Sequence, residues 1–387
     1  MNTRVLSIIW LSLFVTQLGF SQSTEEIVIG SKQYIDSQIL GETREYWVSL
    51  PDSYNEEPHA SDHFPLLIVL DGRSLFRTVS GTVGFLGATQ GIPQMIVVGV
   101  VSTNRERDYT PDKIVTRRSN QTGGADNFLS FVGKELLPRI ETSLRTSSYK
   151  VLVGHSLGGL LAVHAYLQPE SDFDAFIAID PSMGTWDSAK MDEKISEVTD
   201  ASLDRFLYIA TANWGARNLR NRDRHVRLYE SLHQRAASNQ FRAKLDYFED
   251  ESHNSIPLVS FYQGLRSLFE GYGMTYREVI AAKQVSSHYE QISNRLNHAF
   301  LPPEELVNRA GYQMLRSEIE SQRLEALMLF ELNAKNYPNS HNAYDSLGEA
   351  FMTLGESDKA IESYRKSLVL NSNNENAKTQ LKLLTEQ

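Results

Sequence analysis

Cysteine is absent from the 387-residue sequence. Its absence excludes disulfide bridges, thiolate nucleophiles, cysteine-ligated metals and lipid attachment at a cysteine. A chain of this length can bury a large core without cross-links, and the usual size of a domain predicts two or three structural units. We expect neither a metal nor an organic cofactor.

A run rich in lysine and arginine is absent as well. The chain carries 38 Lys and Arg residues against 48 Asp and Glu residues, so its formal net charge is −10. Proteins that bind nucleic acids present concentrated positive charge to the phosphates. The sequence therefore predicts no nucleic-acid partner.

Long apolar runs are missing beyond the N-terminus. Residues 1–22 place one basic residue, Arg4, before an apolar stretch that ends in small or polar residues near Ser21. This order is typical of a cleaved secretory signal peptide, and an uncleaved amphipathic anchor is the alternative. We expect an exported protein, periplasmic or secreted, with no stable membrane span after cleavage.

Short β-rich runs and longer amphipathic runs alternate between residues 25 and 272. The β-rich runs are YWVSL, LLIVL, MIVVGVV, KVLVG, FDAFIAID, FLYIAT and LDYF. Several of them are apolar throughout, as in a parallel sheet whose two faces are both covered by helices. This part of the chain is therefore predicted to be an α/β domain in which a mostly parallel sheet is the middle of three layers.

Strand candidates are absent after Tyr272, where helical patterns continue almost to the C-terminus. A pair of prolines interrupts the first part of this region. We therefore predict a helical connector over residues 273–306 and an all-α tail over residues 307–387.

The tail contains an internal repeat. Shifting the sequence by 34 residues superposes Ala326 on Ala360 and Phe330 on Tyr364. The second copy, AYDSLGEAFMTLGESDKAIESYRKSL, resembles a tetratricopeptide repeat, which is a helix pair that stacks on its neighbours. Two copies are fewer than a free-standing solenoid needs, so we expect the tail to pack on the connector or the α/β domain and to offer a surface to a protein partner.

A serine lies between glycines where a strand-like run becomes helix-like. In YKVLVGHSLGGLLAVHAY, residues 150–153 predict a strand and Leu157 the start of a helix. The turn between them, GHSLG, fits the Gly-x-Ser-x-Gly pattern, which strains the serine backbone and exposes its hydroxyl. Ser156 is the predicted nucleophile, and the amide of Leu157 is a predicted oxyanion donor. The alternative is a glycine-rich turn without catalysis.

A serine nucleophile needs a base, which in this arrangement follows the last strand of the sheet. His253 fits, because it comes after LDYFED and before the helix-like run IPLVSFYQGLRSLF. His155 is part of the serine turn, and His164, His225 and His233 fall in predicted helices, where a packing or surface role is favoured. His253 is therefore the predicted base.

The acid that orients the base is expected in the loop after FLYIAT. The only carboxylate of that loop is Asp223, whose alternative role is to cap the following helix. Asp250 and Glu251 lie close to His253 in sequence, and either could orient the imidazole instead. A Ser-His dyad without an acid is a further alternative. We predict Asp223 and keep the other possibilities open.

The remaining site residues are expected in loops at the carboxyl ends of strands, where α/β sheets bind ligands. The turn after LLIVLDG predicts a second oxyanion donor, the amide of Gly72 or Arg73. Four side chains in other loops are candidates for substrate contact: Arg107, Asp108, Trp186 and Trp214. For Arg107, Asp108 and Trp186, structural ion pairing or lid packing is the equal alternative.

The order of these motifs resembles the esterase family of α/β-hydrolases, which includes S-formylglutathione hydrolases, feruloyl and acetyl esterases, siderophore esterases and mycolyltransferases. The resemblance covers residues 25–272. It is similar to exported bacterial members with a tetratricopeptide tail, in which RERDYTP, TGGADNF, GHSLGGL and HNSIPL occur in this order. The resemblance implies a triad of Ser156, Asp223 and His253. PSMGTWD departs from relatives that have a tryptophan directly after the Pro-Ser pair.

We therefore expect a serine hydrolase that cleaves carboxylic esters, with a carbohydrate acyl ester or a siderophore-type ester as substrate. An acyltransferase would use the same triad. A catalytically silent assembly module acting through its helical tail is the alternative from another class, and the intact serine turn and base argue against it.

Overall fold

The computed structural model describes residues 26–56, 62–114, 121–186, 188–215, 220–236 and 241–386. The predicted signal segment, residues 1–22, lies outside the described residues. Within the described ranges, no helix is both long and apolar enough to cross a membrane.

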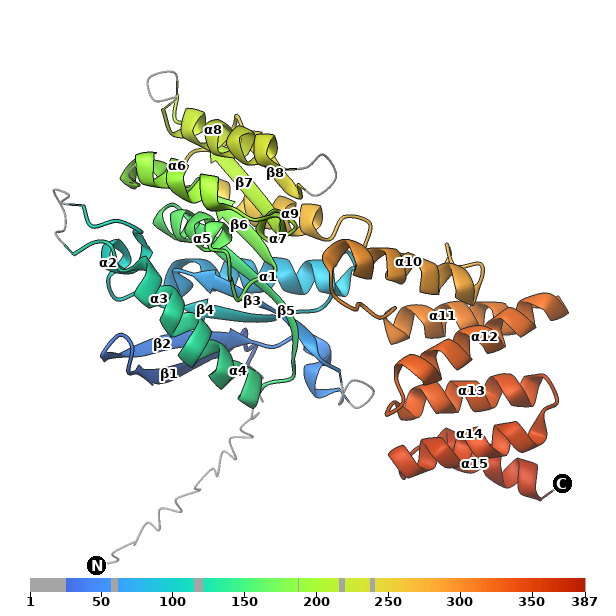
Figure 1. The fold of residues 1–387 in the computed structure, drawn as a ribbon. Coiled ribbons are helices and arrows are strands. Elements are labelled where there is room, and N and C mark those ends of the chain that lie inside the picture. Colours follow the sequence, from blue (N-terminus) through green and yellow to red (C-terminus); the bar gives the residue numbers. More distant parts are fainter. Residues whose placement is uncertain are drawn as a thin grey trace, which may run out of the picture.

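One sheet of eight strands runs through the α/β part, in the order β1-β2-β4-β3-β5-β6-β7-β8 (Figure 1). Strands β3 to β8 pair in parallel, whereas β2 pairs antiparallel with both β1 and β4. The strands are β1 Ser31–Ser37, β2 Glu42–Ser49, β3 Phe64–Leu70, β4 Ile96–Val100, β5 Thr146–His155, β6 Ala175–Ile179, β7 Phe206–Ala212 and β8 Ala243–Phe248. The predicted α/β-hydrolase class with a mostly parallel sheet is confirmed.

Helices cover both faces of the sheet, which is why the central strands carry apolar residues on both sides. Side chains of β3, β4, β6 and β7 are buried along their whole length. On one face lie α1 Gly72–Ala88 and α9 Ile256–Leu268. The helices of the other face are α2 Arg105–Tyr109, α3 Ala125–Phe131, α4 Leu137–Ser143, α5 Leu157–Leu167, α6 Ser188–Glu197, α7 Asp200–Leu203 and α8 Arg220–Arg235.

Three short elements complete this part of the chain. A π-helical turn, η3 Val132–Leu136, joins α3 to α4, and two 3-10 turns are η1 Asp52–Asn55 and η4 Met183–Thr185. The parallel order places the carboxyl ends of β3, β5, β6, β7 and β8 at one edge, where ligand sites of α/β sheets form.

The C-terminal region is helical, as the sequence predicts. Its helices are α10 Ala282–Leu296, α11 Glu304–Leu315, α12 Glu320–Asn336, α13 His341–Thr353, α14 Ser357–Leu370 and α15 Glu375–Thr385. Two helix pairs repeat one contact: a Cβ added at Gly311 would meet the ring of Phe330, and a Cβ added at Gly348 would meet the ring of Tyr364. The aromatic residues that the sequence repeat aligned thus occupy equivalent positions against a glycine.

The helical region shares one buried core with the sheet. Phe300, between α10 and α11, packs against Tyr149 of β5 and Phe269 after α9, with ring centroids 5.4 and 6.0 Å apart. Nδ1 of His298 lies 3.2 Å from the hydroxyl of Ser148. The same apolar cluster includes residues of α10 to α15. The connector is therefore packed on the α/β part, and the helices of the tail follow it away from the sheet (Figure 1).

Candidate active site

Ser156 lies in a strained turn between β5 and α5. Its φ of 61° and ψ of −116° are rare for a residue with a side chain. The turn needs small neighbours, because a Cβ at Gly154 would lie 2.2 Å from the carbonyl oxygen of Gly158 and one at Gly159 would lie 2.9 Å from that of Ile179. The backbone N–H of Ser156 donates to Ile179 O at 2.9 Å. The sequence therefore holds the serine at the carboxyl edge of the sheet.

His253 connects Ser156 to a buried carboxylate. Its Nε2 lies 3.1 Å from the Oγ of Ser156, and its Nδ1 lies 2.5 Å from Oδ2 of Asp180. The histidine sits in the loop between β8 and α9, and Asp180 directly follows β6. Three strands thus contribute a serine, an imidazole and a carboxylate that form one hydrogen-bonded chain.

The acid of this chain corrects the prediction of Asp223. Asp223 lies in the first turn of α8, with its side chain exposed, and the structure does not bring it to His253. Asp250 is exposed after β8, and Glu251 accepts the backbone N–H of Asn213 with its main-chain carbonyl. The reason is the strand order: β6 lies directly between β5 and β7, so its carboxyl end is nearer to the serine turn than the loop after β7.

Asp180 is fully buried, and its carboxylate accepts several hydrogen bonds. It accepts from the backbone N–H of Ala212 at 3.2 Å and from Nε1 of Trp214 at 2.9 Å. Burial alone would raise the pKa of this carboxyl, but the hydrogen bonds with His253 and with the Ala212 amide hold the pKa below its usual value. Asp180 is therefore ionised and can stabilise a protonated imidazole.

Two aromatic rings lie against the imidazole of His253. The ring of His155 lies 4.5 Å away and that of Trp214 lies 4.7 Å away, centroid to centroid. Burial, with His253 adding to it, lowers the pKa of His155 to about 4, so this neighbour is neutral around pH 7. Trp214 is 41% exposed, which places it at the mouth of the site as well as against the base.

A second turn brings backbone amides to the same edge of the sheet. Asp71 follows β3 with a φ of 56°, and α1 begins at Gly72. The first amides of a helix have no acceptor within the helix. Gly72 must lack a side chain, because its Cβ would lie 2.7 Å from the backbone of Gly99. The predicted donors Gly72, Arg73 and Leu157 are thus all in the first turn of a helix.

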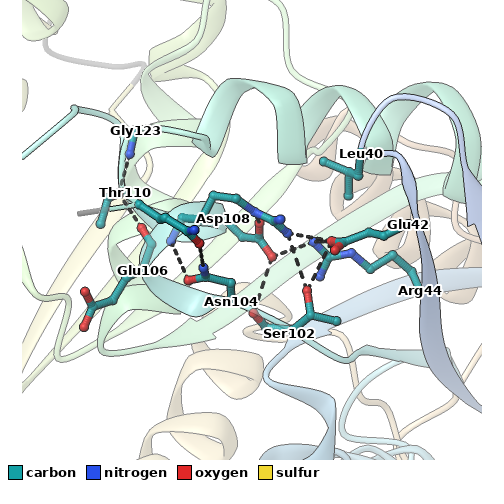
Figure 2. Close-up of polar contacts among 12 residues, drawn as sticks. Leu40, Glu42, Arg44, Ser102, Asn104, Glu106, Asp108, Thr110 and Gly123 are labelled. Carbon is teal, nitrogen blue, oxygen red and sulfur yellow. Dashed lines mark hydrogen bonds and ion pairs between the residues drawn. The ribbon is translucent and has the colours of Figure 1, made fainter. Parts of the chain in front are cut away.

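Three of the predicted substrate-contact residues, Arg107, Asp108 and Trp186, make ion pairs or packing contacts within the fold, which was the alternative role given for them. Figure 2 shows Asp108 in a polar cluster where the buried guanidinium of Arg44 reaches it at 2.7 Å. Arg107 donates to Asp108 at 2.7 Å and to Glu42 at 2.6 Å. Trp186 is buried beside His164. Of the four candidates, Trp214 is the one that contacts the serine–histidine–aspartate chain.

Sequence reasoning missed Asp180 and Arg105. Asp180 ended a predicted strand, and a carboxylate directly after a buried strand was the available signal. Arg105 belongs to the same RERDYTP segment as Arg107, but its guanidinium binds Asp71, 34 positions earlier in the sequence. No local pattern connects those two residues.

The arrangement can perform nucleophilic acyl chemistry. A hydroxyl bonded to an imidazole, itself bonded to a carboxylate, is the geometry that activates serine. Among the described residues, no group of three or more His, Asp or Glu side chains is arranged to hold a metal ion.

Comparisons with known proteins place the chain among esterases. The chain is 28% identical over 161 residues to the ferri-bacillibactin esterase BesA of Bacillus subtilis, covering 37% of this chain and 55% of BesA. The chain spans about half the length of the curated relatives it matches.

Two solved structures extend the likeness. An IroE-like serine hydrolase from Shewanella oneidensis has a TM-score of 0.69 at 27% identity, over 79% of this chain and 99% of that one. A protein of unknown function from Capnocytophaga ochracea has a TM-score of 0.61 at 20% identity and covers 92% of this chain and 100% of its own. The second likeness concerns the fold alone.

The family model described as "Putative esterase" matches residues 37–235. This range holds Ser156 and Asp180, and it amounts to more than half of the 387 residues. The chain belongs to the Putative esterase family of α/β-hydrolases.

Proposed function

We propose that this protein hydrolyses carboxylic esters through an acyl-enzyme. Ser156 Oγ attacks the acyl carbon while His253 Nε2 takes its proton, and His253 then returns that proton to the leaving alcohol. Water, activated by the same imidazole, releases the acid and restores Ser156. Asp180 holds the imidazole through Nδ1 and stabilises its charged form.

The observation that carries this proposal is the hydrogen-bonded chain itself. Ser156 Oγ, His253 and Asp180 are joined by contacts of 3.1 and 2.5 Å. The serine occupies a backbone conformation that costs free energy and that is typical of functional sites. A catalytically silent binding module would have no physical need for such a turn.

The charge that develops on the substrate oxygen needs donors beside Ser156. The amide of Leu157 follows the nucleophile directly, and the amides of Gly72 and Arg73 begin α1 at the neighbouring strand end. We assign the oxyanion site to Leu157 and to Gly72 or Arg73.

The substrate class that we propose is a siderophore-type ester, with acylated carbohydrates as the second candidate. Relatives of similar sequence are described as siderophore esterases, among them BesA and the enterobactin esterase of Emericella nidulans, which is 32% identical over 160 residues. Both substrate classes present an acyl carbon to the same triad, so the walls of the pocket decide between them.

Fluorophosphonate labelling of the purified chain, read by peptide mass, tests the nucleophile. We expect one adduct on Ser156, none on Ser156→Ala, and turnover of short-chain aryl esters by the wild type only. A screen of cyclic siderophore esters and of acetylated or feruloylated sugars then ranks substrates by kcat/KM. Product analysis with an added alcohol separates hydrolysis from acyl transfer. No adduct on folded protein would contradict the proposal.

We further propose that the protein is exported, on the strength of residues 1–22, and that its helical tail binds a protein partner. Cell fractionation with N-terminal sequencing of the mature chain tests export. Mature protein that begins at Met1 in the cytoplasm would contradict it.

A further inference from the structure

We propose that Arg105 is a positioning residue that holds the two halves of the oxyanion site together, an inference that rests on the proposed ester hydrolysis. Its guanidinium bridges the turn that begins α1 and the turn that carries Ser156. Neither turn is otherwise fixed to the other by a charged group among the described contacts.

The first half of the bridge is a two-pronged ion pair. Arg105 Nε donates to Asp71 Oδ1 at 2.7 Å, and Nη2 donates to Asp71 Oδ2 at 2.9 Å. A paired contact of this kind fixes the orientation of the carboxylate as well as its distance. Asp71 is the residue before Gly72 and has a left-handed backbone, which a side-chain-bearing residue adopts only when its surroundings hold it there.

The second half reaches the serine turn. Arg105 Nη2 also donates to the backbone carbonyl of His155, at 3.3 Å, and His155 directly precedes Ser156. The side chain of Arg105 therefore contacts Asp71, which precedes Gly72, and His155, which precedes Ser156. A shift of either turn would stretch a hydrogen bond to the same guanidinium.

The charge of Arg105 matters as well as its reach. A Cβ at Gly158 would lie 3.3 Å from Asp71 Oδ2, so the Asp71 carboxylate lies against the first turn of α5. A bare negative charge there would oppose an oxyanion forming at the Leu157 amide. Burial raises the pKa of Asp71, and Arg105 counters that rise. The ion pair thus keeps the site neutral where the substrate becomes negative.

Arg105 itself is held on a rigid support. It begins α2, whose Asp108 binds the buried Arg44 of β2 (Figure 2). Arg107 of the same helix binds Glu42 of β2. The hydroxyl of Tyr109 accepts the backbone N–H of Asp71 at 3.3 Å. The RERDYTP segment therefore contacts the Asp71 turn through Arg105 and Tyr109. It contacts β2 through Arg107 and Asp108.

The test compares Arg105→Gln and Arg105→Lys with the wild type in ester turnover. Loss of an oxyanion donor costs about 10²–10³-fold, so misplacement of donors should lower kcat/KM by on the order of 10–100-fold in Arg105→Gln, with the loss mainly in kcat. Arg105→Lys keeps the charge without the fork and should lose less. Arg227→Gln on α8, which removes an exposed ion pair with Asp192 of α6, is the matched control and should keep wild-type kinetics.

The Ki of an aryl trifluoromethyl ketone distinguishes a role in positioning the oxyanion donors from a merely structural role. Its adduct with Ser156 carries an oxyanion, so its Ki should rise in Arg105→Gln by the same factor by which kcat/KM falls. The double variant Asp71→Asn with Arg105→Gln removes the bare carboxylate and should recover part of that loss. Guanidinium ion added to Arg105→Gly should restore turnover in a saturable way.

Two results would overturn the inference while leaving ester hydrolysis intact. In the first, the wild type is active and Arg105→Gln has the same kcat/KM and the same trifluoromethyl ketone Ki as the wild type. The other is a fall in kcat/KM without any change in that Ki. An inactive wild type that takes no fluorophosphonate would instead contradict the proposed function itself.

Discussion

At the scale of single residues, the acid of the proposed triad separates what a sequence can specify from what it cannot. Ser156 and His253 could be predicted because a glycine-flanked turn and a histidine after the last strand are local patterns. Asp180 was not, because its role depends on which strand lies beside β5 in space. Strand order is a property of the packed sheet, so a carboxylate at the end of a predicted strand did not by itself identify Asp180 as the acid.

Exchanging the acid tests this correction. Asp180→Asn should lower kcat by about 10⁴-fold, because the amide no longer holds the imidazole in the required tautomer. Asp223→Asn should stay within about twofold of the wild type, since an exposed residue in the first turn of α8 does not touch His253. Steady-state kinetics on an aryl ester measure both. The reverse ranking would return Asp223 to the triad.

Trp214 shares an oxygen of Asp180 with the base, which makes it a sensitive position. Trp214→Phe keeps a ring against His253 but removes the N–H that donates to Oδ2. Hydrogen bonds to charged groups contribute about 1.5–3 kcal/mol, so we expect kcat to fall by roughly tenfold or more. Trp47→Phe, on β2, is the control and should leave kcat unchanged. Equal kcat values for the two variants would remove Trp214 from the acid–base pair.

At the scale of elements, α8 is fastened to the sheet by a buried histidine. His225 Nε2 donates to the carbonyl of Pro181 at 2.7 Å, and its Nδ1 lies 2.9 Å from the hydroxyl of Thr211. Burial lowers the pKa of His225, against the opposing pull of Asp180, so the folded protein keeps this imidazole neutral. The helix that was expected to supply the acid instead supports the turn that does.

This histidine predicts a pH dependence of stability. An unfolded histidine binds a proton near pH 6.5 while folded His225 does not, so the free energy of unfolding should fall as pH drops below about 6.5. Each such site contributes at most about 1.4 kcal/mol per pH unit, and His155 acts in the same direction down to about pH 4. His225→Gln should flatten the slope between about pH 6.5 and 5 in urea unfolding. An unchanged slope would show that His225 is protonated in the fold.

Elements were also where prediction succeeded most. Continuous apolar runs such as LLIVL and FLYIAT became fully buried parallel strands, and the aromatic residues aligned by the repeat became equivalent packing residues in α12 and α14. Periodicity within a run is local, so the sequence reveals it. The contact between Arg105 and Asp71 is not local, and it emerged only from the fold.

At the scale of the whole molecule, sheet and tail share a core, and Phe300 lies at their junction. Phe300→Ala should destabilise the protein by about 3–5 kcal/mol, because it removes a buried ring that packs against Tyr149 and Phe269. Val369→Ala, an exposed position on α14, should change stability by less than about 0.5 kcal/mol. Thermal unfolding followed by both circular dichroism and residual esterase activity should show one shared transition for the wild type. A tail that melts first while activity persists would contradict a continuous core.

The position of that junction has a consequence for handling the protein. Tyr149, which contacts Phe300, and Ser156 lie seven positions apart near opposite ends of β5, so about 23 Å of extended strand separates the attachment of the tail from the nucleophile. We therefore expect a resin, an electrode coating or a fused scaffold that is attached to the C-terminal helices, for example through α15, to leave the carboxyl ends of the strands accessible.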